Sequence, residues 1–138
     1  MKMKVMLDEG ARMPLRAHPF DAGMDLFTRE DCLIPARGSA VVDTGVHVAI
    51  PEGYAGFIKS KSGLNVKKNV QAEGVIDAGY IGPIVVKVYN HGDADVLLRA
   101  GDKLTQLVIL PVLLPELELS ESLDETERGA GGFGSTGR

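Results

Sequence analysis

The apolar residues of this chain gather into short runs rich in β-branched side chains. Four runs have the length and composition of strands: SAVVDTGVHVAI (39–50), YAGFIKS (54–60), PIVVKVYN (83–90) and KLTQLVILPVLL (103–114). Turn-forming sequences such as PEG, DAGY, NHGD and AGD separate them. No long stretch repeats its apolar residues with the 3.6-residue helical period, and only 64–70 has room for a helical turn. The pattern predicts an all-β sandwich, barrel or jelly roll.

The pattern of strands stops near Pro115. The following sequence is acidic, PELELSESLDETE, and then glycine-rich, RGAGGFGSTG. At 138 residues the chain has the length of one domain. We therefore expect residues 1–114 to form a β core and residues 115–138 to form a mobile arm with a glycine-rich lid, within the same domain.

Composition and charge narrow the possible partners. Hydrophobic residues make up 44% and charged residues 25%, as in ordinary globular proteins. A formal net charge of −4 argues against a nucleic-acid duplex or an anionic membrane as partner, but a small anion needs only a local positive cluster. The one cysteine, Cys32, excludes an internal disulfide and suits a reducing cytoplasm. No apolar run is long enough for a signal peptide or a membrane span.

The glycine-rich ending matches two nucleotide-binding patterns at once. Gly129, Gly131 and Gly134 fit G-x-G-x-x-G, and the phosphate-loop pattern also fits, except that Ser135 replaces its lysine. Both patterns require a helix after the glycines, and too few residues follow for one. Two interpretations remain: a disordered tail, or a flap in which Arg128 binds phosphate and an aromatic ring covers a base.

Other segments carry candidate chemistry, each with a structural alternative. The sequence KSKSGLNVK (59–67) is either a polyphosphate site or a basic turn between strands. Asp77, in GVIDAGYIG, either caps its own turn or deprotonates water at the end of a strand. Asp21 and Asp25 either lie near Mg²⁺ or belong to a solvated turn. Gln106 interrupts an apolar strand and is either bonded in the core or turned to a ligand.

The three histidines do not form a recognisable site. His18, His47 and His91 are far apart in the sequence and lack zinc-like spacing with Cys32. We expect each of them at the surface or in a turn.

Taken in order, five of these segments resemble the five motifs of the trimeric dUTPase family, the deoxyuridine triphosphate nucleotidohydrolases. They are AGMDL, KSGL, GVIDAGY, GDKLTQLV and RGAGGFGSTG, and they span residues 22–137. The resemblance implies a jelly-roll-like distorted barrel, assembled as a homotrimer with composite active sites between subunits. It also implies that dUTP and water give dUMP and pyrophosphate with Mg²⁺ in the cytoplasm, which limits uracil in DNA and supplies dUMP for dTMP synthesis.

The resemblance assigns roles to individual residues. Asp77 matches the carboxylate that activates water for in-line attack on the α-phosphorus, a reaction governed by positioning and charge neutralisation. Tyr80 matches the ring that packs on deoxyribose and excludes a ribose hydroxyl. Phe133 would close over uracil, and Asp25 matches the aspartate that holds metal-bound water. Uracil would be read by the backbone of Gly74, Val75 and Ile76 and, less securely, by Gln71; the phosphates would be held by Lys61, Ser62, Gly63, Gln106, Arg128, Gly134, Ser135 and Thr136.

One position departs from the family pattern, because Lys61 stands where arginine is common. Lysine supplies charge without a bidentate fork, so we expect altered phosphate contact, with Lys59 sharing the task. Two alternatives stay open: a dCTP deaminase, for which Glu73 is not at the matching position, and a binding or regulatory protein on the same scaffold. The strand pattern excludes the dimeric, all-α dUTP hydrolases.

Overall fold

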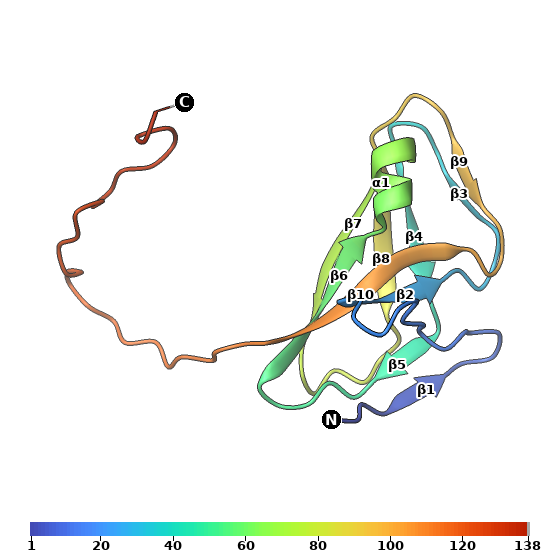
Figure 1. The fold of residues 1–138 in the computed structure, drawn as a ribbon, viewed down its shortest axis with the longest axis horizontal. Coiled ribbons are helices and arrows are strands. Elements are labelled where there is room, and N and C mark those ends of the chain that lie inside the picture. The colour runs from blue at the N-terminus through green and yellow to red at the C-terminus, as the bar shows by residue number, and fades with distance from the viewer. Residues whose placement is uncertain (138) are drawn as a thin grey trace.

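The computed structural model describes residues 1–137, and within them it is almost entirely β (Figure 1). The elements are β1 (Val5–Leu7), β2 (Gly23–Phe27), β3 (Cys32–Ile34), β4 (Ser39–Asp43), β5 (Val46–Val48), β6 (Tyr54–Ser60), α1 (Ser62–Lys68), β7 (Val70–Ile76), β8 (Val85–Asn90), β9 (Val96–Leu98) and β10 (Lys103–Pro111). A curled six-stranded sheet has the order β2-β10-β6-β7-β8-β4, and the pairs β1-β5 and β3-β9 flank it. The pairing is antiparallel throughout. The prediction of an all-β fold is confirmed.

Alternation along the strands builds the core. In β8, Val86 and Val88 are buried while Val85, Lys87 and Tyr89 are exposed, as the two faces of a strand require. The inward side chains of the other strands meet these valines in one cluster, and burial of their apolar surface is the main force that closes the sheet. The largest fully buried apolar members are Leu26, Ile34, Ile84, Leu104 and Leu107.

The run at 39–50 forms two strands instead of the one expected. The break falls at Thr44 and Gly45, where Gly45 has φ +66°, a conformation that favours glycine. β4 pairs with β8, whereas β5 pairs with β1 in a different sheet. The buried Thr44 hydroxyl donates a 2.7 Å hydrogen bond to the carbonyl of Ile84, which fixes the corner. The chain changes sheet here. Asp43, Thr44 and Gly45 interrupt the apolar run, but the run does not show that its two halves pair in different sheets. The run at 54–60 coincides with β6.

The helix α1 lies two residues earlier in the chain than the segment 64–70, in which a helical turn was expected. Asn69 ends it in the left-handed conformation with φ 58°, which asparagine tolerates, and its N–H bonds to the last carbonyls of the helix. Lys67 and Lys68 lie in the last turn, where positive charge is favourable. None of its residues is fully buried, so the sequence shows no apolar helical face.

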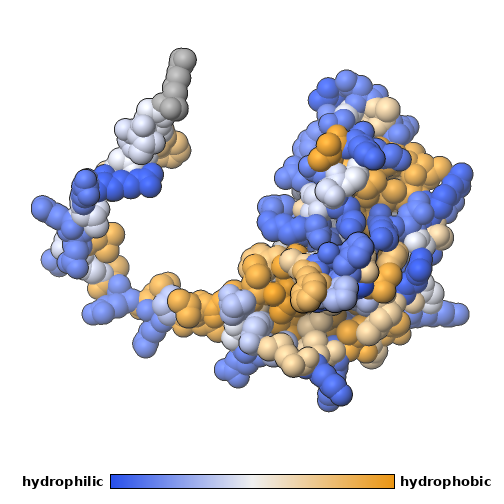
Figure 2. Space-filling model, viewed as in Figure 1, coloured by the Kyte–Doolittle hydropathy of each residue, from blue (hydrophilic) through white to orange (hydrophobic). Residues whose placement is uncertain are grey.

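Residues 112–137 form neither helix nor strand and lead away from the barrel as a long arm (Figure 1). Figure 2 shows apolar and hydrophilic side chains following one another along it, uncovered by the barrel. Its leucines are almost fully exposed, with Leu113 at 93% and Leu119 at 100%. Within residues 1–137 no helix has the length and apolar character that a membrane crossing needs.

Candidate active site

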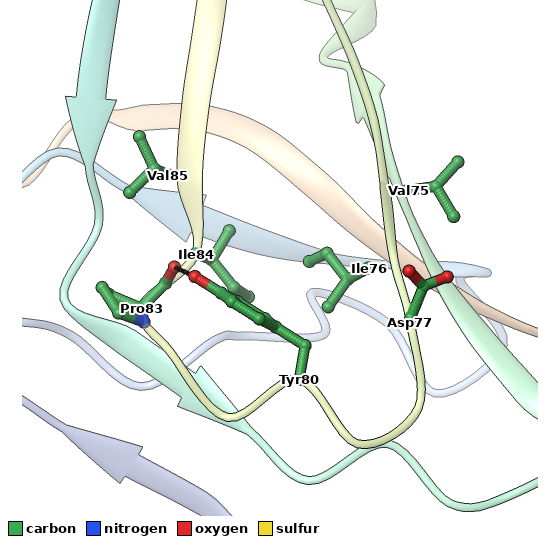
Figure 3. A pocket seen from close by; sticks show the side chains of 7 residues that line it. All are labelled: Val75, Ile76, Asp77, Tyr80, Pro83, Ile84 and Val85. Atoms are coloured by element: carbon green, nitrogen blue, oxygen red, sulfur yellow. Dashed lines mark hydrogen bonds between the residues drawn. The ribbon is translucent and has the colours of Figure 1, made fainter.

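A pocket of about 240 Å³ lies where β7 and β8 separate (Figure 3). The ladder between these strands covers only Val70–Ala72 of β7, so the strands diverge toward the turn that joins them. The polar backbone groups of β7 that face β8 beyond Ala72 are therefore left out of that ladder, and such groups need a partner. The pocket is lined by Val75, Ile76, Asp77, Tyr80, Pro83, Ile84 and Val85.

A tight turn places Asp77 and Tyr80 at the pocket. The N–H of Tyr80 donates to the carbonyl of Asp77 at 3.2 Å, and Gly79 between them has φ +90°. Positive φ at the third position is the mark of a type II turn, for which glycine is the natural residue. Figure 3 shows the Asp77 carboxylate at the end of β7 and the Tyr80 ring between the two strands.

The Tyr80 ring is held flat across its own loop. Its hydroxyl donates a 2.9 Å hydrogen bond to the carbonyl of Pro83. A Cβ at Gly82 would come within 2.4 Å of the Tyr80 hydroxyl oxygen and 2.6 Å of the ring. Gly82 is therefore required for the ring to lie where it does, and any side chain there would push the ring aside.

A second cluster surrounds Asp25 on β2. This carboxylate is 3% exposed, and its oxygens lie 2.5 Å from the Lys61 ammonium and 2.8 Å from that of Lys103. Burial by itself raises the pKa of Asp25. The hydrogen bonds and charges of Lys103 and Lys61 outweigh burial, so the pKa lies below its usual value. Asp25 is thus an ionised carboxylate between two cations, and the interpretation as a solvated turn is wrong for Asp25, whereas Asp21 is exposed beside a turn.

Gln106 lies beside this cluster on β10, the strand between β2 and β6. In the β10 register it faces Asp25 of β2 on one side and Lys59 of β6 on the other. Its side-chain amide donates to the carbonyl of Ser60 at 2.9 Å. A Cβ at Gly23 would lie 2.1 Å from the Gln106 amide oxygen, so the glycine makes the room that this side chain occupies.

The segment that follows β6 presents Ser62 and Gly63 to solvent at the start of α1. Lys61 precedes them and reaches back to Asp25. The first N–H groups of a helix lack partners within it, so they are available to an acceptor. The hydroxyl of Ser62, the backbone N–H groups and the ammonium of Lys61 thus follow one another directly in the chain, where Lys61 contacts Asp25.

The end of the arm is a series of turns away from both clusters (Figure 1). Phe133 with φ 50° and Gly134 with φ 92° form the centre of one turn, closed by the N–H of Ser135 donating to the carbonyl of Gly132. The Phe133 side chain is fully exposed. Arg128 donates to the carbonyl of Gly131, and Thr136 is exposed beside this turn.

Comparison with known proteins decides what these clusters belong to. The family model described as dUTPase matches residues 9–137. The chain belongs to the dUTPase family. The deoxyuridine 5'-triphosphate nucleotidohydrolase of Arabidopsis thaliana is 45% identical over 132 residues, which cover 95% of this chain and 80% of that protein. The resemblance drawn from the five motifs is confirmed.

Solved dUTPase structures have the same fold. The dUTPase of Staphylococcus bacteriophage 80alpha, solved with dUPNHPP, has a TM-score of 0.94 at 33% identity over 99% of both chains. A mutant dUTPase from phage phi11 of S. aureus, solved to show coordination of a structural Mg(II) ion, has a TM-score of 0.82 at 35% identity over 88% of this chain and 98% of that one. The predicted dUTPase-type jelly-roll fold is confirmed.

The five dUTPase motifs fall into three separate groups in the structure. The first, second and fourth meet around Asp25, Lys61 and Gln106. The third lines the pocket between β7 and β8. The fifth lies on the arm, apart from both. Gln71 is outside all three, because its side chain is on the exposed face of β7 with His91 at 2.9 Å.

The two clusters of this dUTPase depend on residues that the sequence analysis did not identify. Lys103 was not singled out, because a lysine at the start of a strand carries no local sign of a distant buried partner. Gly23 and Gly82 are needed for space, which only neighbouring side chains reveal. Lys59, expected to share the phosphate contact, pairs with Glu73 at 2.8 Å.

The described side chains of this dUTPase do not by themselves form a metal site, so a Mg²⁺ ion would have to be held mainly by the substrate. Within residues 1–137 no three His, Cys, Asp or Glu side chains gather to hold a metal ion. Mg²⁺ usually keeps several waters and binds through one or two carboxylates plus substrate phosphates. A single ionised Asp25 beside Lys61 suits that arrangement, since a carboxylate has more lone pairs than its two ion pairs use.

Asp25→Asn is expected to lower the free energy of unfolding by about 1–3 kcal/mol at pH 7, because it leaves two lysines without their buried counter-charge. The pKa of Asp25 is lower in the folded protein than in the unfolded chain. Its contribution to the free energy of unfolding is therefore complete above the unfolded-state pKa and is lost as pH falls through the folded-state pKa. Urea unfolding at fixed protein concentration should therefore show the difference at pH 7 and a smaller one as the solution is acidified. The exposed pair Asp93–Arg37 supplies the control, Asp93→Asn, with an effect within about 0.5 kcal/mol. A difference that does not shrink in acid would contradict the charge argument.

Proposed function

We propose that this chain hydrolyses dUTP to dUMP and pyrophosphate, with the nucleoside in the pocket between β7 and β8. The main structural support for this proposal is the pocket, because one type II turn places both Asp77 and Tyr80 in its wall. The relative from Arabidopsis thaliana bears the name of this activity, and the phage 80alpha enzyme binds dUPNHPP, an analogue of dUTP.

Uracil would be read by the free edge of β7. The strands separate beyond Ala72, so Val75 and Ile76, which line the pocket, have no ladder partner on β8, and Gly74 directly precedes them. A flat base with paired N–H and C=O groups supplies the complementary donors and acceptors. The role of Gln71 stays a prediction, since its side chain faces His91.

Asp77 would act as the general base. It accepts a proton from a water molecule, whose oxygen forms a bond to the α-phosphorus as the bond to the bridging oxygen breaks and pyrophosphate leaves. The site contributes mainly by aligning water, phosphorus and leaving group. A carboxylate at the end of a strand, on a turn fixed by Gly79, is well suited to hold that water in one position.

The triphosphate would lie against the cluster around Asp25. Lys61, Ser62, Gly63 and Gln106 offer ammonium, hydroxyl, backbone N–H and amide groups, and Arg128, Gly134, Ser135 and Thr136 would add theirs from the arm. Mg²⁺ bound to the triphosphate would neutralise charge on the phosphates, and Asp25 would hold it through water. The Mg(II) ion of the phage phi11 enzyme is described as structural, so the catalytic role is our proposal.

A homotrimer with composite sites would bring the three groups together. Residues 115–138 would act as an arm on the core formed by residues 1–114. Exposure of Leu113, Leu117 and Leu119 to water is unfavourable at about 25 cal/mol per Å², so a neighbouring subunit that covered them would stabilise the assembly. Light scattering tests this, since a fully active monomer would contradict it. Cytoplasmic location and the absence of nucleic-acid or membrane partners stay predictions.

The alternative of a dCTP deaminase is disfavoured by Glu73. Deamination needs a glutamate that exchanges protons at the cytosine amino group. A hydrogen bond from Lys59 lowers the pKa of this exposed side chain and keeps it ionised, which does not suit a proton shuttle. One assay separates the functions: incubation with dUTP, dCTP, dTTP or UTP and Mg²⁺, followed by pyrophosphate measurement. Selective release from dUTP is expected, and its absence would overturn the proposal.

Tyr80→Ala is expected to relax the choice of sugar. The ring would no longer fill the space of a ribose 2′-hydroxyl, so the ratio of kcat/KM for dUTP to that for UTP should fall by about 10- to 100-fold. Steady-state kinetics with both substrates measure it. Tyr89→Ala, on the exposed face of β8, is the matched control and should leave the ratio unchanged. An unchanged ratio in Tyr80→Ala would remove Tyr80 from sugar recognition.

A further inference from the structure

His47 occupies an unusual position between the amino-terminal strand and the loop of the nucleoside pocket. It lies in β5 and its side chain is 15% exposed, contrary to the expected surface or turn position. One ring nitrogen, Nδ1, lies 2.7 Å from the carbonyl oxygen of Ile81, and the other, Nε2, lies 3.0 Å from a carboxylate oxygen of Asp8. The carbonyl of Ile81 and the ionised carboxylate of Asp8 can accept hydrogen bonds but cannot donate them. Both contacts are hydrogen bonds only when each nitrogen carries a proton, which is the imidazolium form.

These contacts reach the pocket through Ile81, which directly follows Tyr80. The same loop is also fixed further on, where the N–H of Ile84 donates to the carbonyl of Val46 at 2.8 Å. The Thr44 hydroxyl also bonds to the carbonyl of Ile84, so the second half of the loop is held by contacts that do not involve His47. The His47–Ile81 bond is thus the side-chain attachment next to the Tyr80 ring.

The charges around the ring favour the protonated form. The hydrogen bond to Ile81 raises the pKa of His47 most, followed by the hydrogen bond to Asp8 and the charges of Asp8 and Asp43, while partial burial acts in the opposite direction. The net result is a pKa above the ordinary value for histidine. Asp8 at the end of β1 and Asp43 at the end of β4 are the ionisable groups that act on His47 from the elements around it.

We propose that protonated His47 is a positioning residue, which fastens the Tyr80 loop to β5 and makes the binding of dUTP depend on pH. This rests on the proposed function, because it assigns the loop to nucleoside binding. When the ring loses a proton, one nitrogen keeps its N–H. A carboxylate is the stronger acceptor, so the remaining proton stays toward Asp8. The bare Nδ1 then faces the Ile81 carbonyl, two lone pairs repel, and the loop is released.

The sign of the effect follows from the raised pKa. The hydrogen bond from His47 to Ile81 is fully formed below the ordinary histidine pKa. It is lost as pH rises through the raised pKa that His47 has in the folded protein. KM for dUTP should rise by about two- to tenfold on the alkaline side, which corresponds to one hydrogen bond of about 0.5–1.5 kcal/mol. Because Asp77 and the phosphate cluster are not altered, kcat should stay within about twofold.

Two amide substitutions separate the two bonds of His47. In His47→Asn the amide nitrogen takes the place of Nδ1 and can donate to Ile81 at every pH, so KM should be low and flat. In His47→Gln it takes the place of Nε2 and can reach only Asp8, so KM should be high and flat. Asp8→Asn removes the carboxylate that keeps the remaining proton on Nε2, so Nδ1 can keep its proton toward Ile81 and the rise in KM should become smaller. His18→Gln, whose exposed histidine pairs with Asp21, is the control and should follow the wild type.

The measurements are KM and kcat for dUTP between pH 7 and 9.5, above the titration of a terminal phosphate at about 6, and the His47 ring signals by NMR over the same range. We expect the wild-type NMR titration midpoint to coincide with the rise in KM, and Asp8→Asn to lower the midpoint and to reduce the rise. A wild-type KM that stays flat while His47 titrates would overturn the inference, as would a His47→Gln profile that matches the wild type. Failure to turn over dUTP would instead refute the proposed function, and the NMR titration would still test the state of His47.

Discussion

Replacement of Asp77 by asparagine is expected to lower kcat for dUTP hydrolysis by about 10²- to 10⁴-fold, the usual contribution of a positioned general base. Asparagine has nearly the same shape and can still orient a water molecule, but it cannot accept the proton. KM should stay within about twofold, because the pocket walls Val75, Ile76 and Tyr80 are unchanged. Pyrophosphate release at saturating dUTP measures the loss.

Two controls make the Asp77 result specific. Asp124→Asn changes an exposed aspartate of the arm and should leave kcat unchanged. Urea unfolding of Asp77→Asn should agree with the wild type within about 0.5 kcal/mol, as for other exposed substitutions. Full activity in Asp77→Asn would show that another group activates the water, although membership in the dUTPase family would stand.

Truncation after Glu127 is expected to lower kcat/KM by at least about 10³-fold. It removes Arg128, Ser135 and Thr136, and hydrogen bonds to charged groups contribute about 1.5–3 kcal/mol each. It also removes Phe133, whose ring would cover the base and exclude water from the reacting phosphate. The barrel should unfold as before, since these residues lie away from the core. An unchanged kcat/KM would show that the arm does not close on the site.

A mixing experiment tests whether the arm acts on a neighbouring subunit. Truncated subunits keep Asp77, and Asp77→Asn subunits keep the arm, so each alone should be nearly inactive. Subunits unfolded together and refolded as mixed trimers should recover activity, because an intact arm can then reach an intact Asp77. If each arm serves the pocket of its own chain, mixing will recover nothing.

The sequence predicts best those features that depend on neighbouring residues. The strand at 54–60 is correct because β6 is a short run of strand-forming residues between turn sequences. The turn that carries Asp77 and Tyr80 is likewise local, because Ala78 and Gly79 between them determine its type. The order of five motifs along the chain was sufficient for the family, and the comparisons confirm it. The strand break at Thr44 was not predicted, because it depends on which strand each half pairs with.

What the sequence alone determined is therefore the class of fold, the family and the turn that carries Asp77 and Tyr80. The tertiary structure decided which charges meet. Asp25 became a buried carboxylate because folding brings β2, β10 and the end of β6 side by side, with Lys103 and Lys61 at its oxygens. His47 meets Asp8 and Ile81, which are 39 and 34 residues away along the chain. Such contacts depend on the register of antiparallel strands, and register is set by the packing of the whole core.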